Sequence, residues 1–266
     1  MLDKNFPTID PKKPYALTKE EEDIMERLER AFENCEKLQR HMHFLLNKGG
    51  LYKVYNGNLL YHGCVPLKED GNLKSVRIFG RAYKGKGLYE VLESYVRKGF
   101  YAMDPKEKER GKDIMWYIWL SENSPLFGKD KMARFERYFL SEKETHKEQK
   151  NPYYLLLEDE KVVEKILKEF GLENEDAHII NGHVPVKCKD GENPVKCGGK
   201  VLVIDGGFSK AYQKETGIAG YTLIYNSYGL ILAAHKPFES TEAAIEKESD
   251  IHSDSTVVKR TLERKK

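Results

Sequence analysis

The sequence predicts a mixed α/β fold of the α+β kind, in which helices dominate the first two-thirds of the chain and strands dominate the remainder. Apolar residues recur at helical spacing over residues 18–45 and in several shorter segments up to residue 170. From about residue 177, β-branched and aromatic runs alternate with glycine-rich turns, a pattern typical of strands. The length of 266 residues allows one large domain or one and a half smaller ones.

The first element is predicted to be a long amphipathic helix that begins at Thr18 and ends before Gly49-Gly50. The Thr18 hydroxyl can cap the first turn, and Glu21 can reach back to the Thr18 amide. Apolar residues follow at intervals of three or four: Ile24, Leu28, Phe32, Cys35, Leu38, Met42 and Leu45. We therefore expect an extended, proline-containing lead-in over residues 1–17 and a helix that packs on another part of the protein.

The rest of the chain divides into a hairpin, a helical segment, a strand-rich segment and a polar tail. Asn56-Gly57 joins two short apolar runs and is a strong hairpin signal. Further helices are expected at about 88–98, 107–120, 129–141 and 158–170, and strands at 177–180, 200–205, 219–226 and 230–238, with a second hairpin at 226–229. Residues 240–266 are almost all polar and are expected to be a frayed helix or a disordered tail.

Composition indicates neither a nucleic-acid-binding protein nor a membrane protein. The 45 basic residues nearly balance the 43 acidic ones, for a net charge of +2. No apolar run approaches 18 residues, and the charged N-terminal segment does not resemble a signal peptide. The four cysteines are scattered and form no Cys-x-x-Cys pair: Cys35, Cys64, Cys188 and Cys197. We expect reduced thiols and a cytoplasmic protein.

Two of the eight histidines stand apart from the rest. His62 and His183 each follow an apolar strand and adjoin a glycine, in "LLYHGC" and "IINGHVP". Such residues project from the rim of a sheet, where small ligands and metals bind, although histidines of capped loops give the same pattern. The remaining six are assigned to packing or solvation: His41, His43, His146, His178, His235 and His252.

Four segments carry a resemblance to a known family: "LLYHGCVPL", "SPLFGKDKMARFERYF", "NGHVPVK" and "KVLVIDGGFSKAYQKETGIAGYTLIYNSYGL". The chain resembles the calcineurin-like metallophosphatases and, within them, the bacterial class III fructose-1,6-bisphosphatases. The resemblance implies a sheet sandwich flanked by helices, with residues 18–239 as the C-terminal part of the catalytic domain and a helical insertion at about 85–170. It also implies that His62 and His183 bind one of two divalent ions, with Mn²⁺ as the expected metal.

The motifs that supply the other metal ligands in that superfamily are missing from the sequence. They are an Asp-x-His, a Gly-Asp-x-x-Asp-Arg and a Gly-Asn-His block, all of which precede the His-Gly motif. The resemblance therefore implies that the chain is the C-terminal portion of an enzyme that hydrolyses fructose-1,6-bisphosphate to fructose-6-phosphate in gluconeogenesis. The N-terminal part of the same enzyme is then its partner, and the chain contributes metal ligands but no other catalytic residue. Two alternatives to this function remain: a non-catalytic regulatory or assembly fragment of the same fold, and a metallophosphatase that acts on another phosphoester. A homo-oligomer is also possible.

Substrate contacts are predicted at two places. The segment "GRAYKGKGL" brings Arg81, Lys84 and Lys86 together with glycines that can bind a sugar bisphosphate, although a solvated basic loop has the same composition. Lys210 and Tyr212 follow a strand end on the expected metal side. Asp205 either orients a ligand histidine by accepting its other proton or caps the turn at Gly206-Gly207.

Overall fold

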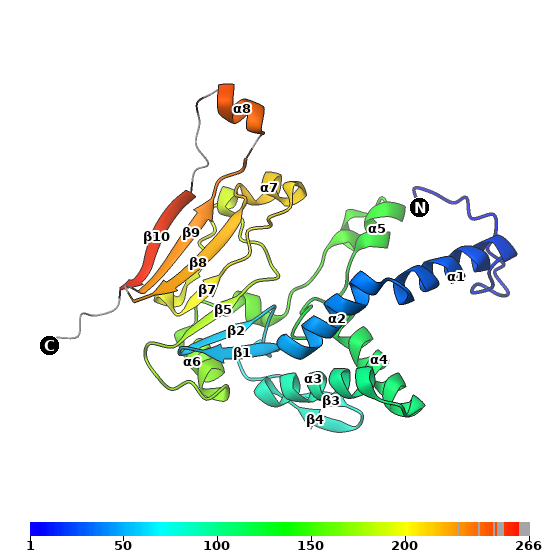
Figure 1. Ribbon diagram of the computed structural model, residues 1–266, viewed down its shortest axis with the longest axis horizontal. Coiled ribbons are helices and arrows are strands. Elements are labelled where there is room, and N and C mark those ends of the chain that lie inside the picture. The colour runs from blue at the N-terminus through cyan, green and yellow to red at the C-terminus, as the bar shows by residue number, and fades with distance from the viewer. Residues whose placement is uncertain (228, 239, 247, 249–252, 261–266) are drawn as a thin grey trace. The chain divides into compact units, whose positions relative to one another are not determined.

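The computed structural model describes residues 1–227, 229–238, 240–246, 248 and 253–260. Helices and strands occupy largely separate stretches of the chain, which confirms the predicted fold class (Figure 1). The chain divides into two compact units, one of residues 1–50 with 131–149 and the other of residues 51–130 with 150–266. His252 lies outside the described residues.

The first unit contains four helical elements: α1 (Lys19–Glu33), α2 (Glu36–Lys48), α5 (Arg134–Phe139) and the 3₁₀ turn η1 (Lys143–His146). The predicted capping box is present, because the Glu21 amide donates to the Thr18 hydroxyl over 3.3 Å and the Thr18 amide donates to the Glu21 carboxylate over 2.8 Å. The prediction of one continuous helix is wrong. The Asn34 side chain donates to the Arg30 carbonyl over 2.8 Å, and Cys35 adopts an extended backbone that separates α1 from α2.

Helix α1 keeps its apolar stripe in contact with solvent. No residue of α1 is buried, and Ile24, Leu28 and Phe32 are 48%, 51% and 65% exposed. The sequence predicts that this helix packs on another part of the protein. Among the described residues α1 does not do so, whereas α2 buries Leu46. An amphipathic helix with an uncovered apolar face is stabilised poorly by itself in water.

The second unit is built on a five-stranded sheet with the order β1-β2-β5-β7-β6 (Figure 1). Its strands are β1 (Tyr52–Tyr55), β2 (Asn58–Tyr61), β5 (His178–Asn181), β6 (Val195–Lys196) and β7 (Val201–Val203). The predicted hairpin is confirmed, since β1 and β2 are antiparallel and are joined by Asn56 and Gly57 with φ angles of 49° and 74°. Strands β2, β5 and β7 are parallel, so their carboxyl ends lie at one edge of the sheet.

A second, antiparallel sheet contains β8 (Gly220–Asn226), β9 (Gly229–His235) and β10 (Ser253–Arg260). The pairing of β8 with β9 confirms the predicted second hairpin, and Tyr228 of its turn lies outside the described residues. Ile180 and Leu202 of the first sheet share an apolar cluster with Leu230 of the second. The two sheets thus pack as a sandwich.

The expectation of a frayed helix or disordered tail after residue 240 is wrong for one stretch. Thr241–Glu246 form the short helix α8, in line with the helical alternative, but Ser253–Arg260 form β10, which pairs with β9. The reason is that β9 offers an open edge for backbone pairing, and Val258 of the added strand packs against the apolar clusters beneath it.

Helices cover the other face of the five-stranded sheet. The remaining elements of this unit are β3 (Val76–Ile78), β4 (Arg81–Tyr83), α3 (Gly85–Tyr101), α4 (Pro105–Leu120), η2 (Pro152–Leu155), α6 (Glu160–Glu169), η3 (Cys188–Asp190), η4 (Cys197–Gly199) and α7 (Lys210–Thr216). Val163 and Ile166 of α6 belong to the same buried cluster as Leu59, Ile179 and Val201 of the sheet. This cluster is the main core and fixes the strand ends described below.

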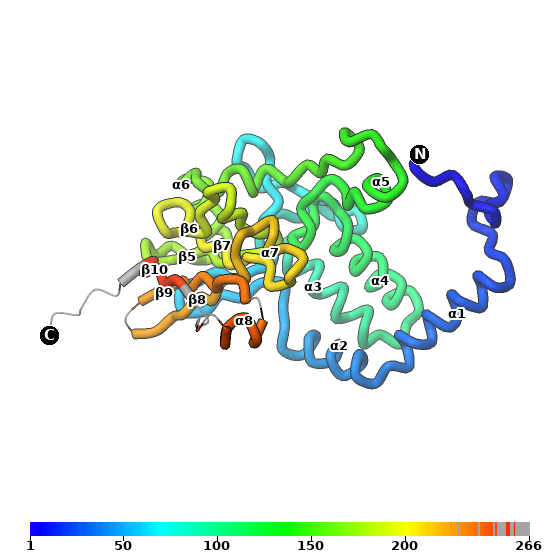
Figure 2. Tube along the Cα trace, turned by 90° about the horizontal axis from the view of Figure 1, so that it is seen from above, coloured from blue at the N-terminus to red at the C-terminus, as the bar shows by residue number. Residues whose placement is uncertain are grey.

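Helices α3 and α4 lie side by side (Figure 2) and meet through two glycines. A Cβ atom added at Gly99 would lie 2.5 Å from the Gly111 Cα atom, which is closer than any side chain can approach a backbone. Gly87, in the same helix α3, has nothing within 4 Å of an added Cβ atom. Helix α3 therefore has room for a methyl group at Gly87 but not at Gly99.

We expect Gly99→Ala to destabilise the chain by about 1–3 kcal/mol, because overpacking forces the helices apart. The matched control Gly87→Ala should stabilise it by about 0.5–1 kcal/mol, because alanine has the higher helix propensity. Urea unfolding followed by circular dichroism measures both. Similar shifts of the unfolding midpoint in the two variants would contradict this account of the helix contact.

Candidate metal-binding site

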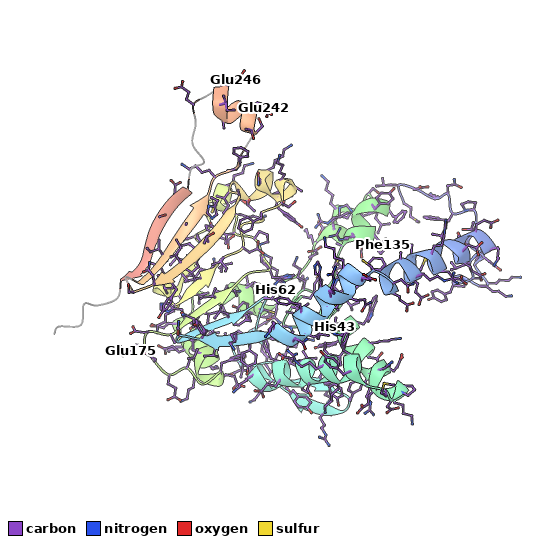
Figure 3. The ribbon with its side chains drawn as sticks, in the orientation of Figure 1. His43, His62, Phe135, Glu175, Glu242 and Glu246 are labelled. Carbon is purple, nitrogen blue, oxygen red and sulfur yellow. The ribbon has the colours of Figure 1, made fainter. Side chains whose placement is uncertain are left out.

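His62 and His183 meet at the carboxyl edge of the five-stranded sheet, although 121 residues separate them in the sequence. His62 directly follows β2 (Figure 3), and His183 comes two residues after β5. The Nε2 atom of His62 lies 3.0 Å from the Nδ1 atom of His183, and the ring centroids are 4.8 Å apart. The prediction that the two imidazoles share one sheet rim is confirmed.

The backbone around His183 is held in a strained turn. The Gly182 amide donates to the His62 carbonyl over 2.9 Å, which ties the two strand ends together. The Val184 amide donates to the Gly182 carbonyl over 2.9 Å, and His183 between them has a φ angle of 69°. This is the geometry of a γ-turn with positive φ, which is rare and strained for a residue with a side chain. Its hydrogen bonds fix the direction of the imidazole.

A loop at residues 124–128 forms one wall of the site. Sequence reasoning missed this role, for which the only signal is that the loop belongs to a segment of the family resemblance. The Cys64 amide donates to the Pro125 carbonyl over 2.9 Å, and a Cβ atom at Gly63 would lie 2.5 Å from the same oxygen. The Phe127 ring is only 5% exposed, and its centroid lies 6.3 Å from that of His183. Burial raises the pKa of the Cys64 thiol to about 12, as befits a packing residue.

Asp205 follows β7 at the same edge and caps a turn. Its carboxylate accepts the Gly207 amide over 3.0 Å, which is the turn-capping alternative that the sequence left open. Its carbonyl accepts the Val186 amide over 2.7 Å and so links β7 to the loop after His183. In the described part of the chain no hydrogen bond joins Asp205 to either imidazole, so its role as an orienting partner stays a prediction.

Both imidazoles are held in their neutral form. Burial is the main cause that lowers the pKa of His183 to about 4, and the neighbouring His62 and Lys129 add to the effect. Desolvation by packed protein atoms also lowers the pKa of His62, while the negative charge of Asp205 opposes this shift. Neutral rings keep a nitrogen lone pair free at pH 7, which a metal ligand requires.

The histidine pair fits part of a metal's ligand set. Two nitrogens bound to one ion at about 2.0–2.1 Å lie roughly 3 to 4 Å apart. The observed 3.0 Å meets this requirement. Over the residues that the structure describes, no group of three or more His, Cys, Asp or Glu side chains is placed to hold a metal ion. The described chain therefore offers two converging donors and no complete site.

The predicted substrate-binding residues lie on β4, at the start of α3 and on α7: Arg81, Lys84, Lys86, Lys210 and Tyr212. Lys86 forms an ion pair with Glu90 at 3.7 Å. Across the described ranges, no hydrogen bond or ion pair connects these five residues to the histidine pair. Their role in substrate binding stays a prediction.

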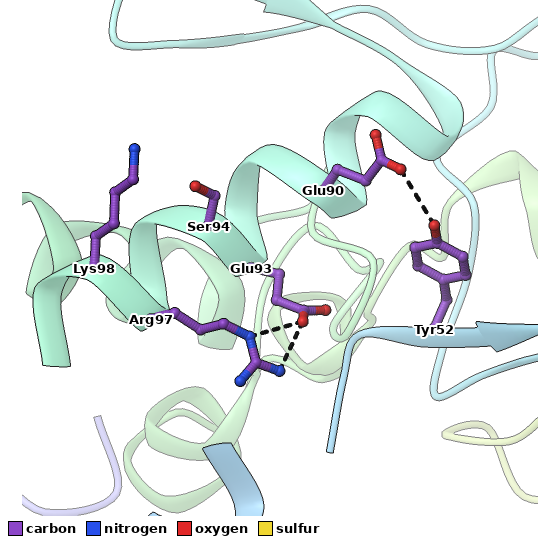
Figure 4. A pocket seen from close by; sticks show the side chains of 6 residues that line it. All are labelled: Tyr52, Glu90, Glu93, Ser94, Arg97 and Lys98. Carbon is purple, nitrogen blue, oxygen red and sulfur yellow. Dashed lines mark hydrogen bonds and ion pairs between the residues drawn. The ribbon is translucent and has the colours of Figure 1, made fainter. Parts of the chain in front are cut away.

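A surface hollow of about 500 Å³ lies beside β1 and α3 (Figure 4) and shares no residue with the histidine pair. Its polar groups pair with one another: the Arg97 guanidinium lies 2.7 Å from the Glu93 carboxylate, and the Tyr52 hydroxyl donates to Glu90 over 3.3 Å. These contacts engage four of the six residues that line the hollow, and the other two are Ser94 and Lys98.

The family pattern of the Firmicute fructose-1,6-bisphosphatases matches residues 1–266, and the chain belongs to this family. It is 55% identical over 267 residues to the class 3 fructose-1,6-bisphosphatase of Clostridium botulinum strain Hall, and 55% identical over 269 residues to that of Alkaliphilus metalliredigens. In both cases the match covers 100% of this chain and 40% of the relative, so the chain spans well under half the length of these relatives. No solved structure matches it.

The part of the chain that the structure describes has no helix that is long and apolar enough to span a membrane.

The low pKa of His183 predicts a specific titration of the metal-free chain. We expect its ring resonances to titrate near pH 4, well below the ordinary histidine value of 6.5. Because the folded pKa lies below the unfolded one, the contribution of His183 to stability is complete above about pH 6.5 and is lost as the pH falls towards 4.

NMR titration identifies the resonance by its loss in His183→Gln, and urea unfolding compares the stability of the two proteins across the same pH range. The unsubstituted chain should lose stability relative to His183→Gln on acidification. A midpoint at or above 6.5 would contradict the burial of the neutral ring.

Proposed function

We propose that the chain is the C-terminal portion of a metal-dependent fructose-1,6-bisphosphatase and supplies two of its metal-ligand histidines. The parent enzyme hydrolyses fructose-1,6-bisphosphate to fructose-6-phosphate and phosphate. The observation that carries the proposal is the convergence of the His62 and His183 nitrogens to 3.0 Å in a chain that belongs to this family. The named relatives are class 3 fructose-1,6-bisphosphatases, which supports the choice of substrate.

In this proposal the chain holds the neutral ring nitrogens of His62 and His183 close enough together to bind one metal ion. The γ-turn directs the His183 ring towards His62, and the Phe127 ring shields its other side from water. When bound, a divalent metal, for which we propose Mn²⁺, supplies Lewis-acid polarisation of a phosphoryl oxygen. Asp205 lies close enough for its negative charge to raise the pKa of His62 against the effect of burial, so it provides negative charge beside the histidine pair.

The N-terminal part of the enzyme is the proposed partner. The chain spans 40% of the length of its relatives, and its described residues hold no third metal ligand beside the histidine pair. The exposed apolar residues of α1 support a missing partner surface as well. The cytoplasm is the proposed location, because the four cysteines are free thiols, which suits a reducing compartment.

The first prediction from this proposal concerns activity. We expect the purified chain of 266 residues to show no measurable hydrolysis of fructose-1,6-bisphosphate with Mn²⁺. Addition of the N-terminal portion of a class 3 relative should restore metal-dependent phosphate release, because it supplies the missing carboxylate and amide ligands. Turnover by the chain alone, or inactivity of a stably assembled mixture, would refute the assignment.

The second prediction concerns the histidine pair in the reconstituted enzyme. His62→Ala and His183→Ala should each lower kcat by more than about 100-fold, since loss of an outer-shell partner alone costs roughly 10- to 100-fold. His41→Ala, at an exposed position of α2, is the matched control and should leave kcat unchanged. Circular dichroism checks that all three variants fold. Near-native activity of either site variant at saturating Mn²⁺ would remove these histidines from the metal site.

A further inference from the structure

Asn181 is the last residue of β5 and lies two residues before His183. Its backbone carbonyl accepts the Ile204 amide over 2.9 Å, just after the end of the neighbouring strand β7. Its side chain reaches the other way, where the Nδ2 atom donates to the Gly63 carbonyl over 3.0 Å. Because Gly63 directly follows His62, this one buried residue connects the end of β5 to the loops on both sides of it.

The bond from Asn181 is one of two that hold the loop after β2. The Gly182 amide donates to the His62 carbonyl over 2.9 Å, so residues 181 and 182 donate to two successive carbonyls of that loop. His62 itself is exposed, whereas Gly63 is buried. The place of the His62 ring therefore follows from the buried backbone that these two hydrogen bonds hold.

The Asn181 side chain is not explained by the packing of the strand. The residue is only 2% exposed, and its Oδ1 atom has no hydrogen-bond partner among the residues that the structure describes. A buried polar atom without a partner disfavours the folded state. The residue before it, Ile180, and its partner on β7, Val203, are both buried and apolar. The amide at this position therefore serves the bond to Gly63.

We propose that Asn181 is a positioning residue for the metal site, because its bond to Gly63 sets how closely His62 approaches His183. The two ring nitrogens lie 3.0 Å apart, as two donors to one ion require. Groups that orient metal ligands without binding the metal typically change metal affinity by about 10- to 100-fold when they are lost. The inference rests on the proposed function and adds to it a residue that acts through His62.

Asn58 provides a matched control at the opposite edge of the same sheet. It is buried as well, at 6% exposed, and its Oδ1 atom also lacks a partner in the described part of the chain. Its Nδ2 atom donates to the Asn56 carbonyl over 3.2 Å, within the β1–β2 hairpin. Asn58 begins β2, whereas His62 follows the end of that strand. A substitution at Asn58 therefore disturbs the sheet without removing a bond to the site.

The first measurement uses the metal-free chain. Amide hydrogen exchange followed by NMR reports on the hydrogen bond from the Gly182 amide to the His62 carbonyl. Asn181→Leu replaces the amide by an apolar group of the same branching, and protection of the Gly182 amide should fall by about tenfold relative to Asn58→Leu. Asn181→Ala removes the same donor without added bulk and should give the same loss relative to Asn58→Ala, should leucine prevent folding. Equal protection in the Asn181 and Asn58 variants would overturn the proposal.

The second measurement adds Zn²⁺ as the probe, because Zn²⁺ is diamagnetic and binds neutral imidazole. The ring resonances of His62 and His183, followed by NMR, give the Kd at the histidine pair itself. Asn181→Leu should raise this Kd by about 10- to 100-fold, and Asn58→Leu should leave it unchanged. Equal Kd values in all three proteins would contradict the positioning role. Absence of Zn²⁺ binding by the unsubstituted chain would refute the proposed metal function, whereas the exchange result decides the role of Asn181 independently.

Discussion

The parallel pairing of β2, β5 and β7 is the constraint on which the site depends. Ile180 pairs with Leu60 on one side and with Leu202 on the other, so the strands run in register and end at one edge. Buried apolar residues cover both faces of these strands and fix that register. Without it, His62 and His183 would lie on loops with no reason to meet, and the loops that follow them would have no common position.

Strain and burial at that edge constrain the two imidazoles. His183 has a positive φ angle, and burial keeps both imidazoles neutral. Gly63 is placed so close to the Pro125 carbonyl that no side chain would fit. The positive φ angle of His183 and the burial of titratable rings both disfavour the folded state, and they persist because hydrogen bonds and packing around the site enforce them. A bound cation would use the arrangement, since it takes the lone pairs that protonation would otherwise occupy.

The proposal of a longer parent enzyme rests on three features. The apolar residues of α1 are exposed, and no group of three or more candidate metal ligands forms among the described residues. The relatives are much longer than the chain, which covers 40% of them. A missing portion that covers apolar surface and supplies oxygen ligands would account for all three observations.

The sequence by itself determined the local features, namely the Thr18 capping box, the Asn56-Gly57 hairpin and most strand positions, because each depends on residues a few positions apart. It also predicted the two site histidines, since a strand end beside a glycine is a local pattern and the family resemblance supplied their relation. Tertiary structure alone decided the pairing of β10 and the wall formed by Phe127. The first arises from an open strand edge, and the second from ring packing between Phe127 and His183, which lie 56 residues apart. No periodicity in the sequence records such long-range contacts.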